Sequence, residues 1–326
     1  MSGGARQLNA RLSKARNAEE LLGLAQAYLG RFDHIHVTTC LYVLAKKKSS
    51  LPAASGRQRG DLQGEVSHAH VALDRSRVLG VLARKQAAFL RDGRLDGRQL
   101  ANTVWAAATL PAQMAFPKGL VMQVCQQISR GADTLSHRDV ANSLWALAVL
   151  DSPSADMALP QLAGSAAVSK PSGFRPQELS NVIWSFASCG FGAGLRQMPR
   201  LTEEAAARHA ELEPQHLANI SWAFAAADLL PGRSTGMGIV ALCSIASEAT
   251  RKIARFKTQE LSNLSWAFST LGEGTRPLAS VLASESRIRA GYLKNQELVN
   301  TAWAFASVAE SSVPRQPQFA NQCVSR

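Results

Sequence analysis

The feature that most constrains this chain is a motif that occurs six times. It reads RQLANTVWAAA at its first occurrence and returns as HRDVANSLWALA, PQELSNVIWSFA, PQHLANISWAFA, TQELSNLSWAFS and NQELVNTAWAFA. The steps between successive tryptophans are 40, 39, 38, 44 and 37 residues. A period in this range is typical of stacked repeats of two helices. The tryptophans of the motif are all the tryptophans of the chain: Trp105, Trp145, Trp184, Trp222, Trp266 and Trp303.

Each copy begins with residues that favour the first turn of a helix. Phe256 stands before the expected start and Leu261 at the fourth helical position, a spacing that allows a hydrophobic staple. Pro176 and Pro214 occupy first helical positions, where a missing N–H group costs nothing. The apolar pair recurs in the other copies as Leu95/Leu100, Leu135/Val140, Phe174/Leu179, Leu212/Leu217 and Leu293/Leu298. Asp96 with Gln99, and Ser136 with Asp139, are expected to cap their helices.

The motif helix has bulky residues on two opposite sides. At about 100° per residue, Leu261 and Phe268 fall on one face, whereas Asn263 and Trp266 point roughly the other way. A helix of this kind is enclosed by neighbours rather than laid on a surface. We therefore expect consecutive repeats to share one continuous core, and the sequence predicts an all-α fold.

The N-terminal part of the chain departs from the repeat. Residues 1–17 are basic and carry no acid, which indicates either an organellar transit peptide or a basic flank that caps the first helix. Residues 18–47 are interpreted as a degenerate N-terminal repeat or cap, with Thr39 at the asparagine position and Tyr42 at the tryptophan position. Residues 48–72, rich in Lys, Gly, Ser and Pro, are predicted to be a flexible insertion, in which a solvated linker is favoured over phosphate contacts.

The remaining boundaries follow from the tryptophan period. Residues 73–310 are predicted to form the array of six Trp-containing repeats, and 311–326 a C-terminal tail. A second, more charged helix is expected between successive motif helices. Within it, Arg251, Lys252, Arg255 and Lys257 are interpreted as a solvated basic face at a helix C-terminus.

Composition narrows the function. A net charge of +12 makes polyanions the first partners to consider, although residues 1–98 hold 17 Lys/Arg against 8 Asp/Glu and residues 99–326 hold 19 against 16. The five cysteines are scattered and are interpreted as free thiols. No apolar run is long enough to span a membrane. His34/His36 and His68/His70 lack further ligands at metal-binding spacing, so neither a metal nor a cofactor is expected.

Signals for an enzyme are missing from the sequence. It contains no GxSxG motif, no phosphate loop ending in GK[ST], and no HExxH motif. The acids of the repeats stand mainly at helix starts, where capping explains them. We therefore expect a binding protein rather than an enzyme.

The motif PQELxNxxWAFA, in units of about 38 residues, resembles the octotricopeptide and heptatricopeptide repeats of algal and protist organelle proteins. It is also similar to the FAST-kinase-like and RAP-domain family of mitochondrial RNA-processing proteins. The resemblance covers roughly residues 18 to 310 apart from the insertion. It implies a right-handed α-solenoid of helix-turn-helix repeats that binds single-stranded RNA, an organellar mRNA or rRNA.

The same resemblance implies a role in RNA processing, transcript stability, translation or ribosome assembly. It places the protein in the mitochondrial matrix or, alternatively, the chloroplast, with ribonucleoprotein or mitoribosomal proteins as further partners. No RAP domain follows the last repeat, so the likeness does not extend to the nuclease activity associated with that module. A scaffold for protein–protein interactions is the alternative function.

Helical-repeat RNA readers offer each nucleotide two or three side chains from one repeat. The preferred candidates for RNA contact are the residues at the second helical position: Arg98, Arg138, Gln177, Gln215, Gln259 and Gln296. The alternative interpretation is that these side chains belong to a solvated helix terminus. The recurring asparagines are favoured as scaffold over sequence-blind contacts to sugar and phosphate: Asn102, Asn142, Asn181, Asn219, Asn263 and Asn300. The tryptophans are favoured as core residues that interlock the repeats over platforms for base stacking. The residues after the asparagines vary as either a base-reading code or an unimportant surface would: Thr103, Ser143, Val182, Ile220, Leu264 and Thr301.

Overall fold

The computed structural model of the chain describes residues 3–47, 62–110, 116–117, 119–150, 155–190, 192–228, 239–271 and 276–309. It divides into two compact units, Met1–Gly131 and Ala132–Arg326. All the secondary structure in the described ranges is helical. The prediction of an all-α fold is therefore confirmed.

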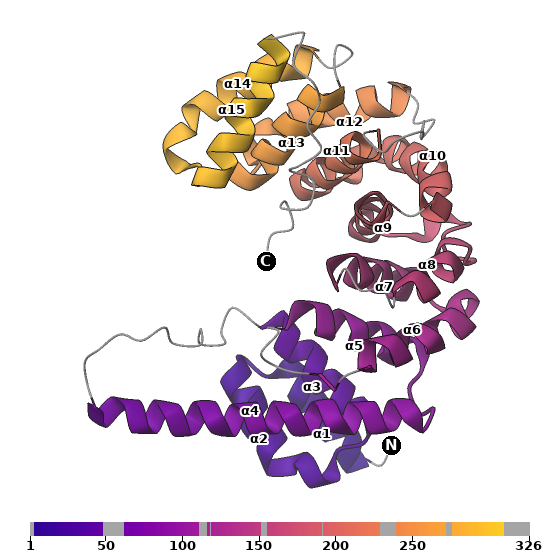
Figure 1. Cartoon of the computed structure of the whole chain (residues 1–326), viewed down its shortest axis with the longest axis vertical. Helices are drawn as coiled ribbons and strands as arrows, with labels where there is room; N and C mark the ends of the chain where they lie inside the picture. The colour runs from indigo at the N-terminus through magenta and orange to yellow at the C-terminus, as the bar shows by residue number, and fades with distance from the viewer. Residues whose placement is uncertain are drawn as a thin grey trace. The chain divides into compact units, whose positions relative to one another are not determined.

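Unit 1 contains six described helices in two layers (Figure 1). The helix α3 packs between α1 and α5, and α2, α4 and α6 lie against this first layer. The bounds are α1 (Gly3–Lys14), α2 (Ala18–Tyr28), α3 (His34–Lys46), α4 (Leu62–Arg91), α5 (Gly97–Thr109) and α6 (Leu120–Gly131).

Unit 2 repeats one arrangement along its length. The motif helices α7, α9, α11, α13 and α15 pack each on the next, and the second helices α8, α10, α12 and α14 do the same in a parallel layer (Figure 1). The bounds are α7 (His137–Leu150), α8 (Ala155–Ala163), α9 (Pro176–Cys189), α10 (Gly192–Ala207), α11 (Pro214–Asp228), α12 (Ile239–Arg251), α13 (Thr258–Leu271), α14 (Arg276–Ile288) and α15 (Asn295–Ala309). A short 3₁₀ turn precedes each motif helix of unit 2.

The motif helices begin where the sequence predicts. Asp96 caps α5 by accepting a hydrogen bond from the Gln99 N–H at 2.8 Å, and the Gln99 side chain accepts from the Asp96 N–H at 3.0 Å. Pro176 and Pro214 are the first residues of α9 and α11. The staple residues are buried in every repeat except the last, where Leu298 is 41 % exposed. Local sequence signals thus fix each helix start.

The basic N-terminal segment forms the helix α1, which packs on α3. Leu12 is fully buried, and the Ala5 carbonyl accepts a hydrogen bond from His36 Nε2 at 2.9 Å. Lys47 Nζ donates to the Arg16 carbonyl at 2.9 Å. The helix α1 is thus anchored in unit 1, and Leu12 and Ala15 belong to its hydrophobic core.

The predicted insertion is shorter than expected. Its C-terminal part, from Leu62 to residue 72, belongs to α4, so the prediction of a flexible segment over 48–72 is wrong for these residues. The stretch from Glu65 to Leu79 contains neither proline nor glycine, and that favours a continuous helix over a linker. Residues 48–61 and the predicted tail 311–326 lie outside the described ranges.

The tryptophans bring consecutive repeats of unit 2 into register. The Trp184 and Trp222 rings lie 6.0 Å apart, and Trp222 lies 6.3 Å from Trp266 in a stacked pair. All three are buried, whereas Trp105, Trp145 and Trp303 are half-buried. Aromatic pairs at this spacing contribute about 0.5–1.5 kcal/mol beyond their buried area. Equivalent positions of α9, α11 and α13 therefore lie side by side.

The two layers of unit 2 come close together at Gly194 of α10. A Cβ atom there would stand 2.3 Å from Cδ1 of Phe186, a fully buried ring of α9. No side chain fits in that space without moving the ring. A glycine at this position is therefore required by packing rather than by backbone conformation.

A hydrogen bond that the sequence does not predict joins consecutive repeats. A basic residue before three of the 3₁₀ turns of unit 2 donates to the backbone carbonyl that precedes the previous motif helix. Arg208 Nη1 donates to Phe174 at 2.8 Å, Lys252 Nζ to Leu212 at 2.6 Å, and Arg289 Nη1 to Phe256. At these three places the bond clamps one repeat to the repeat before it.

The clamp corrects the interpretation of the basic cluster on α12. Lys252 is 5 % exposed, and its ammonium also binds Glu248 at 2.8 Å and the Ala210 carbonyl at 3.0 Å. Arg251 and Arg255 are exposed, as expected for a solvated face. Lys252 is instead a buried structural cation, because the carbonyls of the preceding repeat reach its helix end.

Candidate nucleic-acid interface

Each motif helix carries its two candidate contact residues four positions apart, on one face of the helix. In α15, Gln296 Nε2 donates a hydrogen bond to Asn300 Oδ1 at 2.9 Å, which shows that the pair meets. Arg98, Arg138, Gln177, Gln215 and Gln296 are exposed, and Gln259 is half-buried. Asn102, Asn142, Asn181, Asn219 and Asn263 are half-buried, and Asn300 is buried. Except in α13, the Arg or Gln near the start of each motif helix is thus more accessible to solvent than the Asn one turn later.

The residues after the asparagines lie in the interior. Thr103, Ser143, Val182, Ile220, Leu264 and Thr301 are all buried. Thr103 Oγ1 donates to the Gln99 carbonyl at 2.6 Å and accepts from Gln86 Nε2 at 2.6 Å. One further residue turns the helix by about 100°, and that rotation takes these side chains from the accessible face into the packing. Both interpretations of these residues, as a base-reading code and as surface, are therefore wrong.

The acids of the motif helices are engaged at the helix starts. The Glu178, Glu260 and Glu297 carboxylates accept hydrogen bonds from the N–H groups of residues 175, 257 and 294 at 2.9–3.0 Å. A carboxylate that binds the first turn of a helix is partly neutralised by the helix dipole. These three carboxylates are thus engaged by the backbone at the helix starts.

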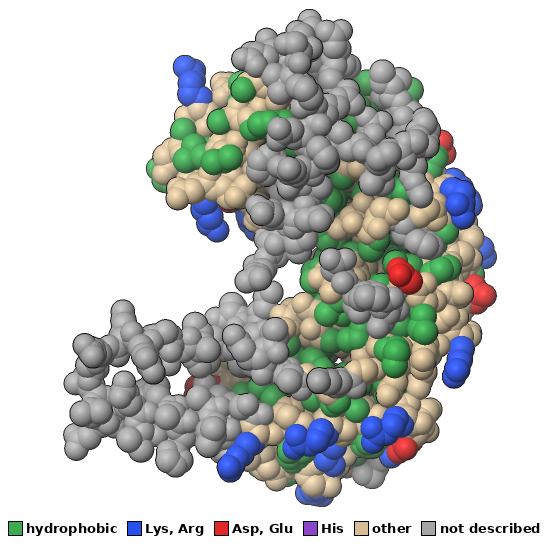
Figure 2. All heavy atoms as spheres, in the orientation of Figure 1, with side chains coloured by type: hydrophobic (Ala, Val, Ile, Leu, Met, Phe, Trp, Pro, Cys, Tyr) green, Lys and Arg blue, Asp and Glu red, His purple; other side chains and the backbone are tan. Residues whose placement is uncertain are grey.

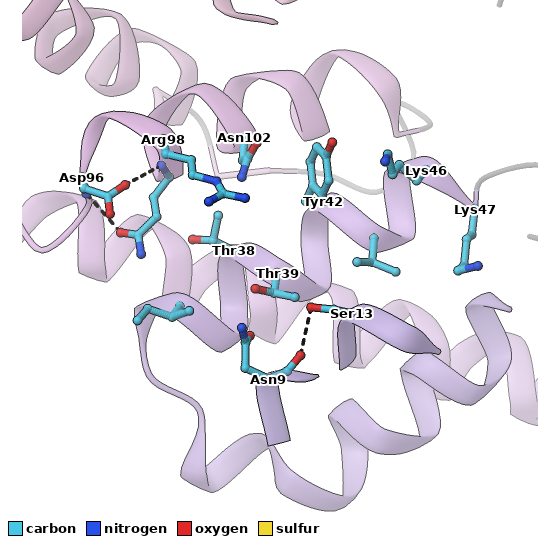
Figure 3. A pocket seen from close by; sticks show the side chains of 13 residues that line it. Asn9, Ser13, Thr38, Thr39, Tyr42, Lys46, Lys47, Asp96, Arg98 and Asn102 are labelled. Atoms are coloured by element: carbon cyan, nitrogen blue, oxygen red, sulfur yellow. Dashed lines mark hydrogen bonds between the residues drawn. The ribbon is translucent and has the colours of Figure 1, made fainter. Parts of the chain in front are cut away.

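A groove of about 620 Å³ opens over α3 in unit 1, with α1 on one side and α5 on the other (Figure 3). We call it the α3 groove. It contains Arg98 and Asn102, the candidate pair of α5. Its lining consists of Asn9, Ser13, Ile35, Thr38, Thr39, Tyr42, Val43, Lys46, Lys47, Asp96, Arg98, Gln99 and Asn102.

The α3 groove exists because the first repeat lacks the long polar side chains of the others. Ile35 stands at the second helical position of α3, and Thr39 stands at the asparagine position. Tyr42 takes the tryptophan position, and its ring packs against Trp105 with the centroids 5.0 Å apart. The predicted alignment of this degenerate repeat thus agrees with the ring packing, and its shorter side chains leave the hollow.

The charge of the α3 groove is mainly positive. The Arg98 guanidinium extends over the groove beside Asn102, and it has no hydrogen bond or ion pair within the described part of the chain (Figure 3). The Lys46 ammonium lies 5.2 Å from the centre of the Tyr42 ring. Asp96 is the one carboxylate of the lining, and it is engaged in the α5 cap. The unpaired charge in the groove is therefore cationic.

The surface of unit 1 that is visible in Figure 2 is rich in positive charge. Figure 2 shows Lys and Arg side chains gathered over the described part of unit 1 in this view. This follows from the excess of 17 Lys/Arg over 8 Asp/Glu in residues 1–98. A field of this sign attracts polyanions.

The described residues offer no second kind of site. They contain no group of three metal-ligating side chains, and none of their helices could cross a membrane. Burial raises the pKa of Cys40 to about 12 and that of Cys125 to about 11, so these thiols are not reactive nucleophiles. The accessible face of the motif helices and the α3 groove are thus the candidate interface.

Comparisons with known proteins add no assignment. The sequence matches none of the protein-family models, and a search of curated proteins finds no relative.

Proposed function

We propose that the chain is a right-handed α-solenoid of helix-turn-helix repeats, each of about 38 residues, that binds single-stranded RNA in an organelle. The mitochondrial matrix is the first location and the chloroplast the alternative. Its role is in RNA processing, transcript stability, translation or ribosome assembly, and it has no catalytic activity of its own. The observation that carries this proposal is the accessible Arg or Gln, with an Asn one turn later, that recurs on every motif helix.

The recurrence fits a chain-like ligand. Successive motif helices of unit 2 pack on one another, and the rings of Trp184, Trp222 and Trp266 lie 6.0–6.3 Å apart, so equivalent side chains of α9, α11 and α13 follow each other along the unit. Arg and Gln side chains bind phosphate oxygens and base edges. Arg98 and Arg138 are exposed, which favours contacts to phosphates over a structural role.

A scaffold for protein partners is the second candidate. Residues 99–326 have nearly balanced charge, and α15 exposes Leu298 and Val299, which are 41 % and 55 % accessible. The equivalent staple leucines of the other motif helices are buried. An exposed apolar helix face of this kind is typical of a protein contact.

The test is fluorescence anisotropy of the full chain with pooled single-stranded RNA across a salt series. An RNA binder is expected to lose affinity steeply as salt rises. Replacement of Arg98 and Arg138 by Ala is expected to weaken binding and to reduce the slope of log K against log[salt] by about 1.4, since each phosphate contact contributes about 0.7. The matched control replaces Arg130 and Arg196, which are exposed on second helices, and should leave the slope unchanged.

A folded, helical chain that binds no RNA at low salt contradicts the proposal and directs the search to protein partners. An equal loss of RNA affinity in the Arg98/Arg138 and Arg130/Arg196 variants would show that binding depends only on net charge. The accessible face of the motif helices would then not be the RNA-binding surface.

A further inference from the structure

The α3 groove differs from the rest of the motif face in being a cavity. The other motif helices place a long Arg or Gln and an Asn on their accessible face, whereas α3 has Ile35 and Thr39 there. A volume of about 620 Å³ lies within the range of sites that enclose a small organic ligand. Side chains that line the groove therefore surround a ligand instead of touching it from one side.

Two cations of the groove, those of Arg98 and Lys46, are accessible to a ligand. The Arg98 guanidinium is exposed and has no partner within the described ranges, so it can present its fork of N–H donors to a phosphate. The Lys46 ammonium is exposed and stands over the Tyr42 ring. Because Asp96 is bound to the Gln99 N–H, no free carboxylate of the lining opposes an anion.

The groove also suits the uncharged parts of a nucleotide. The Tyr42 ring lines it between Lys46 and Asn102 and provides an aromatic surface for a base or sugar (Figure 3). Asn9 Oδ1 on α1 is buried and has no hydrogen-bond donor within the described part of the chain. An unsatisfied amide oxygen costs stability unless a ligand or water supplies the donor. Base amino groups and ribose hydroxyls are such donors.

We propose that the α3 groove binds one nucleoside phosphate unit, with its phosphate at Arg98 and its base or ribose between Tyr42 and Asn9. The unit is either one nucleotide of a bound RNA strand or a free mononucleotide. The first source rests on the proposed function, and the second does not. The helix α1 is then part of the binding site, because it supplies the wall that carries Asn9.

The inference is tested on the full chain with two substitutions that act differently. Thr39→Phe fills the groove without changing charge, and Arg98→Gln removes a charge while keeping the residue that four other motif helices carry at this position. Arg130→Gln, an exposed arginine of α6, is the matched control. Circular dichroism melts verify that each variant is folded, and Arg98→Gln, being exposed, keeps the test valid if Thr39→Phe does not fold.

The first arm measures binding of a fluorescein-labelled single-stranded RNA by anisotropy. We expect Thr39→Phe and Arg98→Gln each to weaken binding at least fivefold, and Arg130→Gln to change it less than twofold. Cross-linking of a 4-thiouridine RNA followed by peptide mapping should place an adduct in α3 or at the start of α5. If the wild-type chain binds RNA but both groove variants bind it equally well, the inference is overturned and the proposed function stands.

The second arm titrates AMP, CMP, GMP and UMP by isothermal calorimetry. If the wild-type chain binds no RNA but binds a mononucleotide, and Thr39→Phe abolishes that binding, the groove holds a free nucleotide. The proposed function is then wrong, whereas the inference about the groove stands. The absence of binding in both arms overturns the inference. Competition by an oligo-glutamate peptide but not by nucleotides also overturns it, since the groove would then accept an acidic peptide.

Discussion

Lys252, directly after α12, should contribute more to stability than the exposed Arg251 and Arg255 beside it. Its ammonium donates to the carbonyls of Leu212 and Ala210 at 2.6 and 3.0 Å and pairs with Glu248 at 2.8 Å. Lys252 and Glu248 are 5 % and 4 % exposed. Hydrogen bonds from Arg251, together with the charge of Lys252, lower the pKa of Glu248 to about 2, so the Glu248 carboxylate is ionised at neutral pH. The change we consider is Lys252→Met, which keeps an unbranched side chain, one atom shorter, and removes its charge.

The expected loss in the free energy of unfolding depends on which contacts Glu248 keeps after the substitution. Hydrogen bonds to a charged group contribute about 1.5–3 kcal/mol each, and breaking a buried ion pair from one side costs about 3–5 kcal/mol. Glu248 keeps its two hydrogen bonds from Arg251, at 2.9 and 2.5 Å, so it is not left uncompensated. We therefore expect a loss of about 3 kcal/mol, at the lower end of the range for buried pairs.

The measurement is the free energy of unfolding from urea denaturation, with hydrogen–deuterium exchange to locate the change in α12 and the 3₁₀ turn after α10. Lys252→Arg is the informative control, because Arg208 and Arg289 occupy the equivalent positions and make the equivalent bond. It should cost less than about 1 kcal/mol, the range of a tolerated substitution. Arg251→Gln, at a side chain that is 64 % exposed, should likewise cost less than about 1 kcal/mol.

A loss below about 1 kcal/mol for Lys252→Met would refute the reasoning, since surface ion pairs contribute no more than that. So would a Lys252→Arg variant that is as unstable as Lys252→Met. In either case the carbonyls of the preceding repeat would not depend on the cation, and the clamp would have no energetic role.

Three further predictions concern the packing and the pH response of unit 2. Gly194→Ala should destabilise the chain by about 1–3 kcal/mol in thermal melts, since its Cβ would overlap the Phe186 ring, and an unchanged melting temperature would contradict the close approach. Leu261→Ala should cost about 2–5 kcal/mol, whereas Leu298→Ala at the exposed end should cost far less; equal costs would show that α15 is covered. Burial lowers the pKa of His216 below 6.5, so the stability linked to it is present above pH 6.5 and decreases as the pH falls below that value. The His216→Gln variant keeps a capping acceptor without titrating, and its stability should decrease less between pH 7.5 and 5.5 than that of the wild-type chain.

Much of the fold is encoded locally and could be predicted from the sequence. The cap of Asp96 with Gln99, the prolines Pro176 and Pro214, and the staple leucines each act within a few residues, so the helix starts can be read without knowledge of the tertiary structure. The Tyr42 ring packs against Trp105, much as Trp184 packs against Trp222 in unit 2.

The features that the sequence did not predict depend on distant parts of the chain. Lys252 is buried only because the carbonyl of Leu212, in the preceding repeat, reaches it. The α3 groove arises from side chains that are short, at Ile35 and Thr39, and from a wall, α1, whose sequence carries no motif. The burial of Thr103 and its equivalents requires the neighbouring helix, here through Gln86. A pattern along one helix cannot show which of its sides another helix will cover.

The burial of the positions after the asparagines restricts how the chain can select an RNA under the proposed function. Since Thr103, Val182, Leu264 and their equivalents are interior, their variation adjusts packing and cannot read bases. The accessible position alternates only between Arg, in the first two motif copies, and Gln, in the other four. Arg matches guanine O6 and N7 or a phosphate, and Gln matches adenine N6 and N7, so this face distinguishes few sequences. Stronger selectivity must then come from a site that encloses its ligand, such as the α3 groove.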